Sequence, residues 1–271
     1  MEKQEKKGVQ FILDGQSVEA APGETVLHVA RRHDIQIPTL CHHESLSPYA
    51  SCRLCLVEAF WGKRSKVVTS CVYEPWENER IETNNQRVRR ARRMVIELLL
   101  ARCPGAKPIR GLASEYGIEA ARFPVGHPPG PEDCILCGLC VRVCDDVVGQ
   151  HAIGYANRGM ERFITTPYGD QGRECIGCGA CVFVCPTGAI RYEDIDGERV
   201  LRGLNIRLEM VKCSVCGKFF ETAKQIEEAR HRVSLPEELA RTCYACRGAT
   251  FGETLKKVLN GHDLNRGIGK R

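Results

Sequence analysis

The stretches CILCGLCVRVC (134–144) and ECIGCGACVFVCP (174–186) decide the architecture of this chain. Each places four cysteines at the spacing C-x2-C-x2-C-x3-C, and a proline follows the second. Three closely spaced thiolates wrap a loop around one face of a [4Fe–4S] cube, while the fourth, at the start of a helix, reaches the other cluster. The repeated motif therefore predicts a small domain with two [4Fe–4S] clusters.

This crossed pattern assigns each cluster three cysteines from one motif and the last cysteine of the other. One cluster takes Cys134, Cys137, Cys140 and Cys185, and the other takes Cys175, Cys178, Cys181 and Cys144. Glycines at 138, 177 and 179 allow close backbone approach and leave amides free for the cluster sulfides.

A third cysteine set lies near the N-terminus, at Cys41, Cys52, Cys55 and Cys71, with the spacing C-x10-C-x2-C-x15-C. A tight cysteine loop with a distant fourth thiolate is typical of plant-type [2Fe–2S] sites. His42 and His43 could replace thiolates, as in Rieske centres, but four cysteines already complete the set. We expect the histidines to hydrogen-bond within the loop or to lie at an electron-exchange surface.

The fourth set is Cys213, Cys216, Cys243 and Cys246, spaced C-x2-C-x26-C-x2-C like two zinc-ribbon knuckles. Four thiolates with no open position favour a structural zinc. Tetrahedral sulfur ligation does not separate zinc from iron, so a rubredoxin-like iron or a further iron–sulfur cluster stays open.

These four sets use all but one of the 17 cysteines, leaving Cys103, which we expect to be a buried thiol. The N-terminus shows no signal peptide and no segment is long and apolar enough to span a membrane, so we expect reduced thiols, metal binding and a cytoplasmic protein. The formal charge is +5 with neutral thiols, and four sites of about −2 each would bring it to about −3. The basic composition therefore does not indicate a nucleic-acid partner.

We predict an α+β, multidomain chain. Residues 1–82 form a [2Fe–2S] domain, 83–130 a helical linker, 131–203 the dicluster domain and 204–271 a zinc-ribbon-like module. Residues 9–20 predict a β-hairpin turning at Asp14-Gly15. A helical period follows, with Val26, Leu27, Val29 and Ala30 as its apolar residues. Residues 84–101 predict an amphipathic helix capped by Asn84 or Asn85, with Val88, Ala91, Val95 and Leu98 or Leu99 as its apolar stripe. We expect its arginine run, 87–93, to be a solvated face, and a short helix at 112–121.

IPTLCHHESLSPYASCRLCLVE (37–58) resembles the N-terminal [2Fe–2S] domain of the large iron–sulfur subunit of respiratory complex I. The same module occurs in diaphorase iron–sulfur subunits of NAD(P)-linked [NiFe] hydrogenases, in multisubunit [FeFe] hydrogenases and in NAD-dependent formate dehydrogenases. The two motifs quoted first, with AIGYANRG (152–159) between them, resemble the dicluster segment of the hydrogenases and formate dehydrogenases. The resemblance implies a β-grasp [2Fe–2S] domain and a ferredoxin-like dicluster domain.

Relatives commonly carry a His-x3-Cys-x2-Cys-x5-Cys box after the basic helix, where this sequence has Cys103 alone, so we expect that cluster to be missing. Ala50 stands where relatives often have glycine. The chain also stops at 271, where [FeFe] hydrogenases and many formate dehydrogenases continue into a large catalytic domain.

The resemblance implies an electron-transfer subunit with no catalytic residues of its own. Its expected partners are a flavoprotein subunit that binds FMN and NAD(P), a small iron–sulfur subunit and a hydrogenase catalytic subunit, with ferredoxin as a further partner if electrons are bifurcated. The alternatives are the same role in a formate dehydrogenase, a free-standing polyferredoxin, and a nucleic-acid-binding redox sensor.

Overall fold

A computed structural model describes residues 8–126, 129–169 and 172–249 of the 271-residue chain. The predicted domain limits at residues 1 and 271 lie outside these ranges. The chain divides into two units, one of residues 1–173, 179–191 and 202–204, the other of residues 174–178, 192–201 and 205–271. None of the helices in the described ranges is long and apolar enough to cross a membrane.

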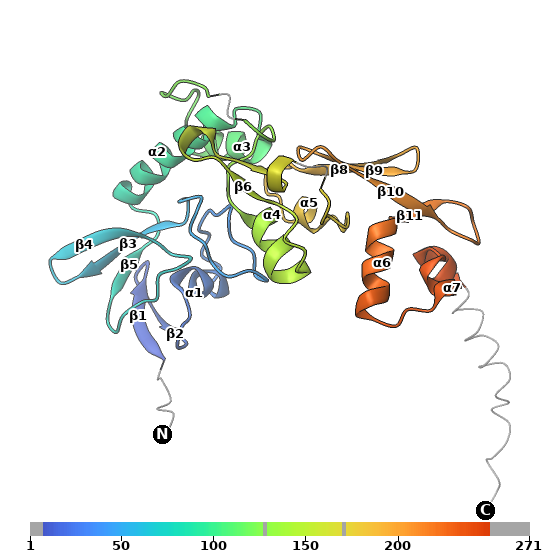
Figure 1. Cartoon of the computed structure of the whole chain (residues 1–271). Coiled ribbons are helices and arrows are strands. Elements are labelled where there is room, and N and C mark those ends of the chain that lie inside the picture. Colours follow the sequence, from blue (N-terminus) through green and yellow to red (C-terminus); the bar gives the residue numbers. More distant parts are fainter. Residues whose placement is uncertain (1–7, 127–128, 170–171, 250–271) are drawn as a thin grey trace, which may run out of the picture. The chain divides into compact units, whose positions relative to one another are not determined.

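The first unit contains a five-stranded mixed sheet in the order β2-β1-β5-β3-β4 (Figure 1). Its strands are β1 (Val9–Leu13), β2 (Gln16–Ala20), β3 (Leu56–Trp61), β4 (Arg64–Thr69) and β5 (Arg80–Glu82). The predicted hairpin is confirmed, since β1 and β2 pair antiparallel and both turn residues, Asp14 and Gly15, have positive φ. Such a turn matches the twist of the two strands.

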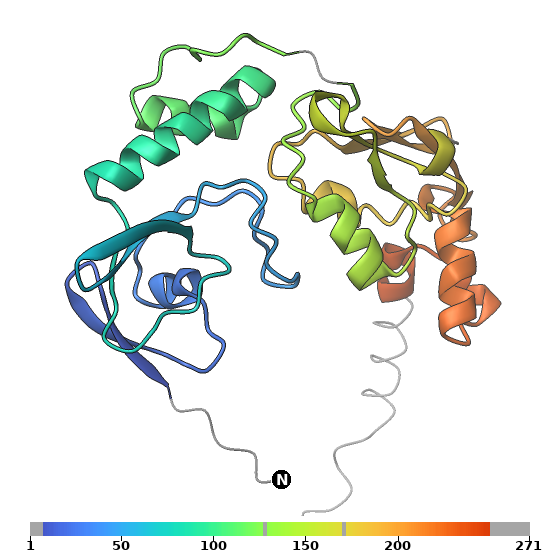
Figure 2. The same cartoon turned by 60° about the vertical axis from the view of Figure 1, so that its left-hand side comes forward.

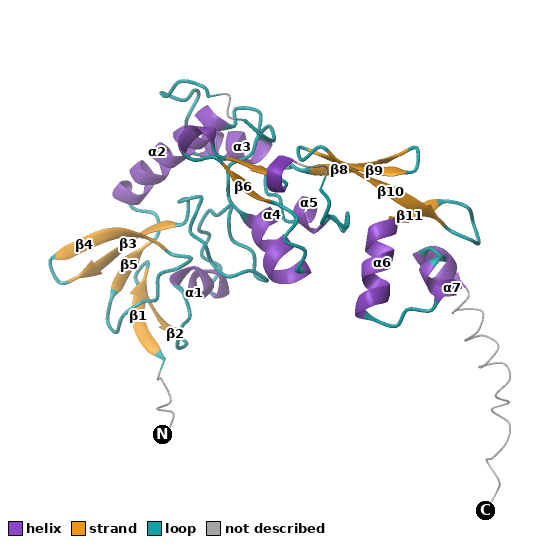
Figure 3. Ribbon diagram, in the orientation of Figure 1, coloured by secondary structure: helices purple, strands orange, loops and turns teal. Residues whose placement is uncertain are grey.

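Helix α1 (Val26–Arg32) buries all four of its predicted apolar residues, Val26, Leu27, Val29 and Ala30. They share one core with the sheet residues Phe11, Leu13, Val57 and Ile81, and the sheet curves around α1 (Figure 2). The chain between α1 and β3 forms no regular structure (Figure 3). This loop contains three of the predicted [2Fe–2S] ligands.

Helix α2 (Gln86–Arg102) begins as predicted at Asn85, whose side chain accepts a hydrogen bond from the Val88 N–H at 2.9 Å. It ends at Cys103. Helix α3 runs over Lys107–Glu115, so the predicted short helix is present, but the predicted bounds, 112–121, were wrong. Pro108 lies in its first turn, where a missing N–H has no cost, and Gly117, with φ of 63°, follows its end.

The buried face of α2 differs from the predicted stripe. Val88 is buried as expected, but Leu98 is 49% exposed, whereas Arg92 and Glu97 are each only 2% exposed. Arg92 donates to the Leu56 carbonyl of β3 at 2.6 Å and to the Tyr116 hydroxyl at 3.3 Å. The arginine run is therefore not wholly a solvated face, because Arg92 fastens α2 to the sheet.

We expect Arg92→Met to destabilise the first unit by about 2 kcal/mol, because the buried Leu56 carbonyl loses its charged donor. Arg90→Met is the matched control, since Arg90 is exposed on the same helix. The measurement is the urea midpoint at which the iron–sulfur absorbance bleaches under anaerobic conditions. Equal midpoints for the two variants would show that Arg92 is not an anchor.

The cysteine-rich part of the first unit is built from short elements. They are α4 (Leu139–Arg142), the π-helical turn η1 (Val143–Val148), the paired strands β6 (Gly154–Ala156) and β7 (Phe163–Thr165), the 3-10 turns Gly159–Glu161 and Pro167–Gly169, and α5 (Ala180–Phe183). α4 packs against α5. Each of these helices begins at a left-handed glycine, Gly138 or Gly179, which closes the cysteine loop before it.

The second unit contains a four-stranded sheet in the order β11-β10-β9-β8 (Figure 1). The strands are β8 (Arg191–Ile195), β9 (Glu198–Arg202), β10 (Ile206–Lys212) and β11 (Phe219–Thr222). Alternate residues of β10, Ile206, Leu208 and Met210, are buried, as in a sheet with one covered face. Helix α6 (Ala223–Arg232) packs on β10 and β11, and α7 (Glu237–Ala240) follows.

Candidate iron–sulfur and metal centres

The loop after α1 brings the four predicted [2Fe–2S] ligands together. Cys41, Cys52, Cys55 and Cys71 are each at most 4% exposed, and Cys71 interacts electrostatically with the other three. The Cys52 N–H donates to Cys41 Sγ at 3.3 Å, and the Leu40 N–H donates to Cys52 Sγ at 3.5 Å. Such N–H donors stabilise thiolates and, once a cluster is bound, raise its potential.

Hydrogen bonds between the thiols lower the pKa of two of them and raise the pKa of the other two. The bond shared with Cys41 lowers the pKa of Cys52 to about 6, and the bond shared with Cys71 lowers the pKa of Cys55 to about 7. The same bonds raise the pKa of Cys41 and Cys71. Cys52 and Cys55 therefore ionise more readily than Cys41 and Cys71, and iron binding would release the protons that remain on the thiols.

The adjacent histidines differ from each other. The His43 Nδ1 accepts a hydrogen bond from the Ser45 N–H at 3.2 Å, which is the predicted role within the loop. The His42 Nδ1 is buried and has no hydrogen-bond partner among the described residues, and its ring meets that of His28 edge-on at 5.3 Å. Burial lowers the pKa of His42 to about 4, so its ring is neutral. Its exclusion from the ligand set stays a prediction.

Left-handed backbone occurs around the cysteine loops. Ala50, where relatives often have glycine, has φ of 57°, and Arg53, between Cys52 and Cys55, has the same value. Leu136, in the first [4Fe–4S] loop, has φ of 52°. Non-glycine residues persist in this region only where their surroundings fix them, and they concentrate at functional sites.

The first [4Fe–4S] set, Cys134, Cys137, Cys140 and Cys185, lies within the first unit. Each of its first three members interacts electrostatically with Cys185. Burial raises the pKa of Cys137 to about 12 and that of Cys140 well above its usual range. Thiolates buried this deeply need a compensating positive charge, and bound iron supplies one. The residues therefore fit an iron–sulfur cluster.

Glycine is required at position 138 of this loop. Its φ is +77°, and a Cβ atom there would lie 2.4 Å from the Tyr155 hydroxyl oxygen. The Gly138 backbone and the Tyr155 hydroxyl therefore lie too close together for any residue with a side chain at position 138.

The two cysteine loops of the first unit are in direct contact. Cys41, Cys52 and Cys137 belong to one buried core, and the thiols of Cys52 and Cys137 interact electrostatically. The Ser51 hydroxyl donates to the Leu136 carbonyl at 3.1 Å, and Arg142 donates to the Cys41 carbonyl at 3.3 Å. Clusters in these loops would be neighbours.

The second [4Fe–4S] set is divided between the units, since Cys144 and Cys181 belong to the first and Cys175 and Cys178 to the second. In the first unit, the Ala152 N–H donates to Cys144 Sγ at 3.4 Å, and Cys181 interacts with Cys140. In the second unit, Cys175 is buried and Cys178 is exposed.

The four C-terminal cysteines meet at the end of the β10–β11 hairpin. All four Sγ atoms lie within 4.8 Å of one another, and those of Cys216 and Cys243 are 3.8 Å apart. A Zn–S bond of 2.3 Å in a tetrahedron places two sulfurs about 3.8 Å apart. A [4Fe–4S] cube binds its thiolates to four different irons and spreads them further. The group therefore fits one tetrahedral ion.

Backbone N–H groups donate hydrogen bonds to the C-terminal cysteines and favour the thiolate form, which binds a cation. The Cys243 and Val215 N–H groups donate to Cys213 Sγ at 3.3 and 3.4 Å, and the hydrogen bond from Cys243 lowers the pKa of Cys213 to about 6. A hydrogen bond with Cys243 raises the pKa of Cys246 to about 12. A metal would displace that proton.

Cys103 is 1% exposed, and burial raises its pKa to about 12. It packs with Ala106 and Ile109 in the same buried core as Cys137. These surroundings suit a thiol rather than a thiolate.

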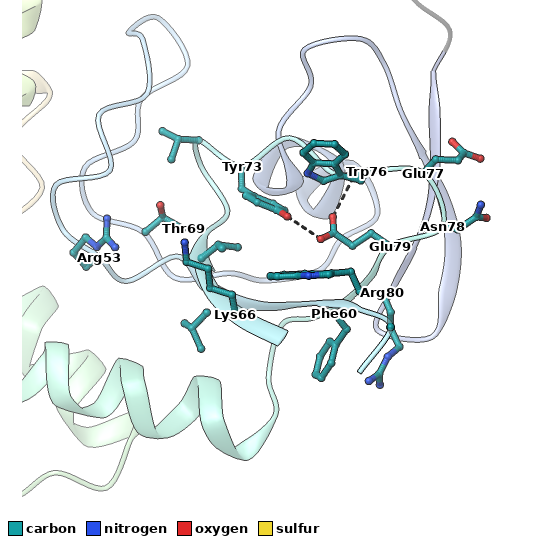
Figure 4. Close-up of a pocket in the computed structure, with 15 residues that line it drawn as sticks. Arg53, Phe60, Lys66, Thr69, Tyr73, Trp76, Glu77, Asn78, Glu79 and Arg80 are labelled. Atoms are coloured by element: carbon teal, nitrogen blue, oxygen red, sulfur yellow. Dashed lines mark hydrogen bonds between the residues drawn. The ribbon is translucent and has the colours of Figure 1, made fainter. Parts of the chain in front are cut away.

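A hollow of about 1010 Å³ opens on the [2Fe–2S] part of the first unit (Figure 4). Both tryptophans of the chain line it, Trp61 and Trp76, which are 45% and 72% exposed. Tyr73 and Glu79 also line it, and the Tyr73 hydroxyl donates a hydrogen bond to Glu79 at 2.7 Å. This tryptophan groove was not predicted from the sequence, and its further lining residues include Arg53, Lys66, Thr69 and Val72.

Comparisons with known proteins agree with this geometry. Residues 6–86 match the model of the "2Fe-2S iron-sulfur cluster binding domain", and residues 133–189 match that of the "4Fe-4S dicluster domain". The NADH-ubiquinone oxidoreductase 75 kDa subunit of Reclinomonas americana is 34% identical over 204 residues, which are 67% of this chain and 29% of that subunit. The chain is homologous to the N-terminal part of that 75 kDa subunit.

The chain is also similar to a second complex I subunit and to a chain of a hydrogenase. The mitochondrial NADH-ubiquinone oxidoreductase 78 kDa subunit of Neurospora crassa is 30% identical over 205 residues, 67% of this chain and 27% of that subunit. A chain of an NAD+-reducing [NiFe]-hydrogenase has a similar structure, with a TM-score of 0.54 and 25% identity, covering 77% of this chain and 88% of that one. This iron–sulfur protein spans less than a third of the length of the first two relatives but most of the hydrogenase chain.

Proposed function

We propose that the chain is the iron–sulfur relay subunit of a multisubunit, NAD(P)H-linked oxidoreductase of the cytoplasm. It carries single electrons between a flavoprotein subunit, which binds FMN and NAD(P), and a hydrogenase catalytic subunit. The observation that carries the proposal is the contact between the loops of Cys52 and Cys137, because neighbouring clusters can exchange electrons directly. A small iron–sulfur subunit is a further partner, and ferredoxin joins if the complex bifurcates electrons.

The relay runs through three clusters. A [2Fe–2S] cluster on Cys41, Cys52, Cys55 and Cys71 exchanges electrons with a [4Fe–4S] cluster on Cys134, Cys137, Cys140 and Cys185. The second [4Fe–4S] cluster, on Cys175, Cys178, Cys181 and Cys144, follows. The protein supplies thiolates, burial and N–H donors, which set the potentials, while the clusters supply the redox chemistry.

The C-terminal cysteines hold zinc in this proposal. The tetrahedral spacing of their sulfurs supports one closed ion, and a ribbon of this type uses zinc for structure. A single iron would fit the same spacing, whereas a further cubane would not. We therefore place no relay step at this site.

The tryptophan groove docks the flavoprotein partner. Arg53 lies between two cluster cysteines and Val72 follows Cys71, so the groove borders the [2Fe–2S] loop. Exposed tryptophans are enriched in the centres of protein interfaces. Glu79 is engaged by the Tyr73 hydroxyl and the Trp76 N–H. Arg53 and Lys66 are left to face a partner segment that combines apolar side chains with carboxylates.

We expect Trp76→Ala to weaken association with the flavoprotein by about 2 kcal/mol, the cost typical of truncating a central interface tryptophan. The [2Fe–2S] spectrum should not change. Met160→Ala, which truncates another exposed apolar residue of the first unit, is the control. Titration of the purified flavoprotein onto each variant measures the dissociation constant. Equal constants for Trp76→Ala and Met160→Ala would show that the flavoprotein does not bind at the groove.

The experiment that tests the proposed function is anaerobic isolation of the tagged chain with its partners, followed by assays of NAD(P) reduction. Reduction driven by hydrogen supports the hydrogenase, for which the coverage of the hydrogenase chain is the argument. Reduction driven by formate would assign the same relay to a formate dehydrogenase. A chain that isolates alone, without a flavoprotein, would contradict the proposal and favour a free-standing carrier.

A further inference from the structure

In the second unit, two side chains hold the Cys175–Cys178 loop against the sheet. Arg199 of β9 donates from Nη1 to the Gly177 carbonyl at 2.9 Å. Thr222, the last residue of β11, donates from Oγ1 to the Ile176 carbonyl. Two successive carbonyls of a predicted cluster loop are therefore bound by residues that the relay itself does not use.

Arg199 is rigidly placed for this contact. Its side chain is only 8% exposed. Nε and Nη2 bind the two carboxylate oxygens of Asp194 at 2.8 and 3.0 Å, and Nη1 also binds Glu221 at 2.6 Å. Two carboxylates around one guanidinium keep it charged and fix its orientation. The geometry is that of a positioning residue rather than a solvated surface cation.

The loop approaches the sheet as closely as its backbone permits. A Cβ atom on Gly177, whose φ is +76°, would lie 2.7 Å from Thr222 Cγ2 and 2.8 Å from Leu208 Cδ1. The C=O and N–H of a trans peptide point in opposite directions. Binding the Ile176 and Gly177 carbonyls to the sheet therefore turns the N–H groups of Gly177 and Cys178 away from it. Those amides stay free to donate to cluster sulfurs.

The same hairpin connects this contact to the C-terminal cysteines. Cys213 directly follows β10, and Cys216 shortly precedes β11, which ends at Thr222. The turn is closed by the Cys213 N–H on the Lys218 carbonyl at 2.9 Å, and Met210 pairs with Thr222 along the ladder. Thr222 Oγ1 also accepts from the Gln225 N–H at 3.2 Å and caps α6. One short strand pair carries the metal ligands at its turn and the loop contact at its other end.

We propose that the four-cysteine site and Arg199 brace the Cys175–Cys178 loop, so that metal at the C-terminal site sets the potential of the second [4Fe–4S] cluster. The inference rests on the cluster assignment of the proposed function. Hydrogen bonds to cluster sulfurs and nearby positive charge raise the potential. Loss of metal from the four-cysteine site would leave the N–H groups of Gly177 and Cys178 poorly oriented toward the cluster sulfurs. Loss of Arg199 would have the same effect and would also remove a positive charge. Both changes would therefore lower the potential of the second [4Fe–4S] cluster.

The test is a redox titration of the full chain, purified anaerobically and followed by electron paramagnetic resonance. The signal of the second cluster is identified by its loss in Cys178→Ser. We expect Arg199→Met to shift the reduction equilibrium of that cluster by about tenfold, which is 59 mV for one electron, toward lower potential. Thr222→Val should give a smaller shift in the same direction. Arg207→Met is the control, since Arg207 is 61% exposed and pairs with Glu198 in the same sheet, away from the cysteine loop.

A second variant, Cys216→Ser, tests the role of the metal. It removes one cysteine of the four-cysteine site and leaves the Cys175–Cys178 loop unchanged. It should lower the potential of the second cluster while the [2Fe–2S] and first [4Fe–4S] signals stay in place. Loss of the second cluster alone from Arg199→Met, with recovery in Arg199→Lys, would also support the brace. Unchanged potentials in variants with full clusters would overturn it. Absence of the second [4Fe–4S] signal from the unmodified chain would instead overturn the proposed function.

Discussion

The Cys137→Ser variant should lose about four of about ten irons and stop electron flow beyond the [2Fe–2S] cluster. Cys137 is buried and its thiol interacts electrostatically with that of Cys52, so it lies where the two proposed clusters would be neighbours. A serine hydroxyl ionises far less readily than a thiol, so the cube loses one of its four anionic ligands at this contact. Iron and sulfide analysis measures the first effect. Reduction of the remaining clusters by the NAD(P)H-linked partner measures the second.

Cys103→Ala is the control for that variant, because Cys103 is equally hidden and lies in the same core as Cys137. Its thiol has no role in the relay, so iron content and reduction rate should match those of the unmodified chain. Loss of iron from Cys103→Ala, or full iron in Cys137→Ser, would contradict the ligand assignment.

The second large effect is expected from Cys243→Ser, which removes one of the four proposed ligands of the C-terminal site. Binding of structural zinc by four thiolates contributes on the order of 10 kcal/mol to the folding of small domains. Most of the described residues next to these cysteines are exposed or half-buried, so packing replaces little of the stabilisation that a metal would supply. We expect residues 205–249 to lose protection from amide hydrogen exchange, while the β1–β5 sheet keeps its protection.

Ser214→Ala is the matched control for Cys243→Ser, since Ser214 lies between two of the ligands and its exposed side chain has no ligand role. It should bind zinc and exchange amides like the unmodified chain. A Cys243→Ser chain with unchanged protection in residues 205–249 would mean that the site does not stabilise this unit.

The elements that were predicted correctly are those whose structure depends on residues close together in the sequence. The Asp14-Gly15 hairpin, α1 and the Asn85 cap were all predicted from neighbouring residues and are present. The matches at residues 6–86 and 133–189 confirm the [2Fe–2S] and dicluster domains, whose signals are dense and strictly spaced. The grouping of the four C-terminal cysteines was likewise predicted from two short knuckles.

Features that depend on distant partners were missed. Arg92 looked like one of several solvated arginines, because nothing near it shows that the Leu56 carbonyl needs a donor. Arg199 gave no signal, since its partners Gly177 and Glu221 are remote in the sequence. Thr222 and Gln225 do form the Thr-x-x-Gln pattern of a helix start, which could have located α6. The one signal for the tryptophan groove is that Trp61 closely follows Cys55 and Trp76 closely follows Cys71, the third and fourth cysteines of the first set.

The measurement that tests the central claim most directly is iron, sulfide and zinc analysis of the anaerobically purified complex, with its partners subtracted. A relay of one [2Fe–2S] and two [4Fe–4S] clusters beside one closed zinc site predicts about ten irons, about ten sulfides and about one zinc per copy of this chain. About six irons would remove one [4Fe–4S] cluster from the relay. About fourteen irons without zinc would contradict the single-ion site and extend the relay to residues 213–246.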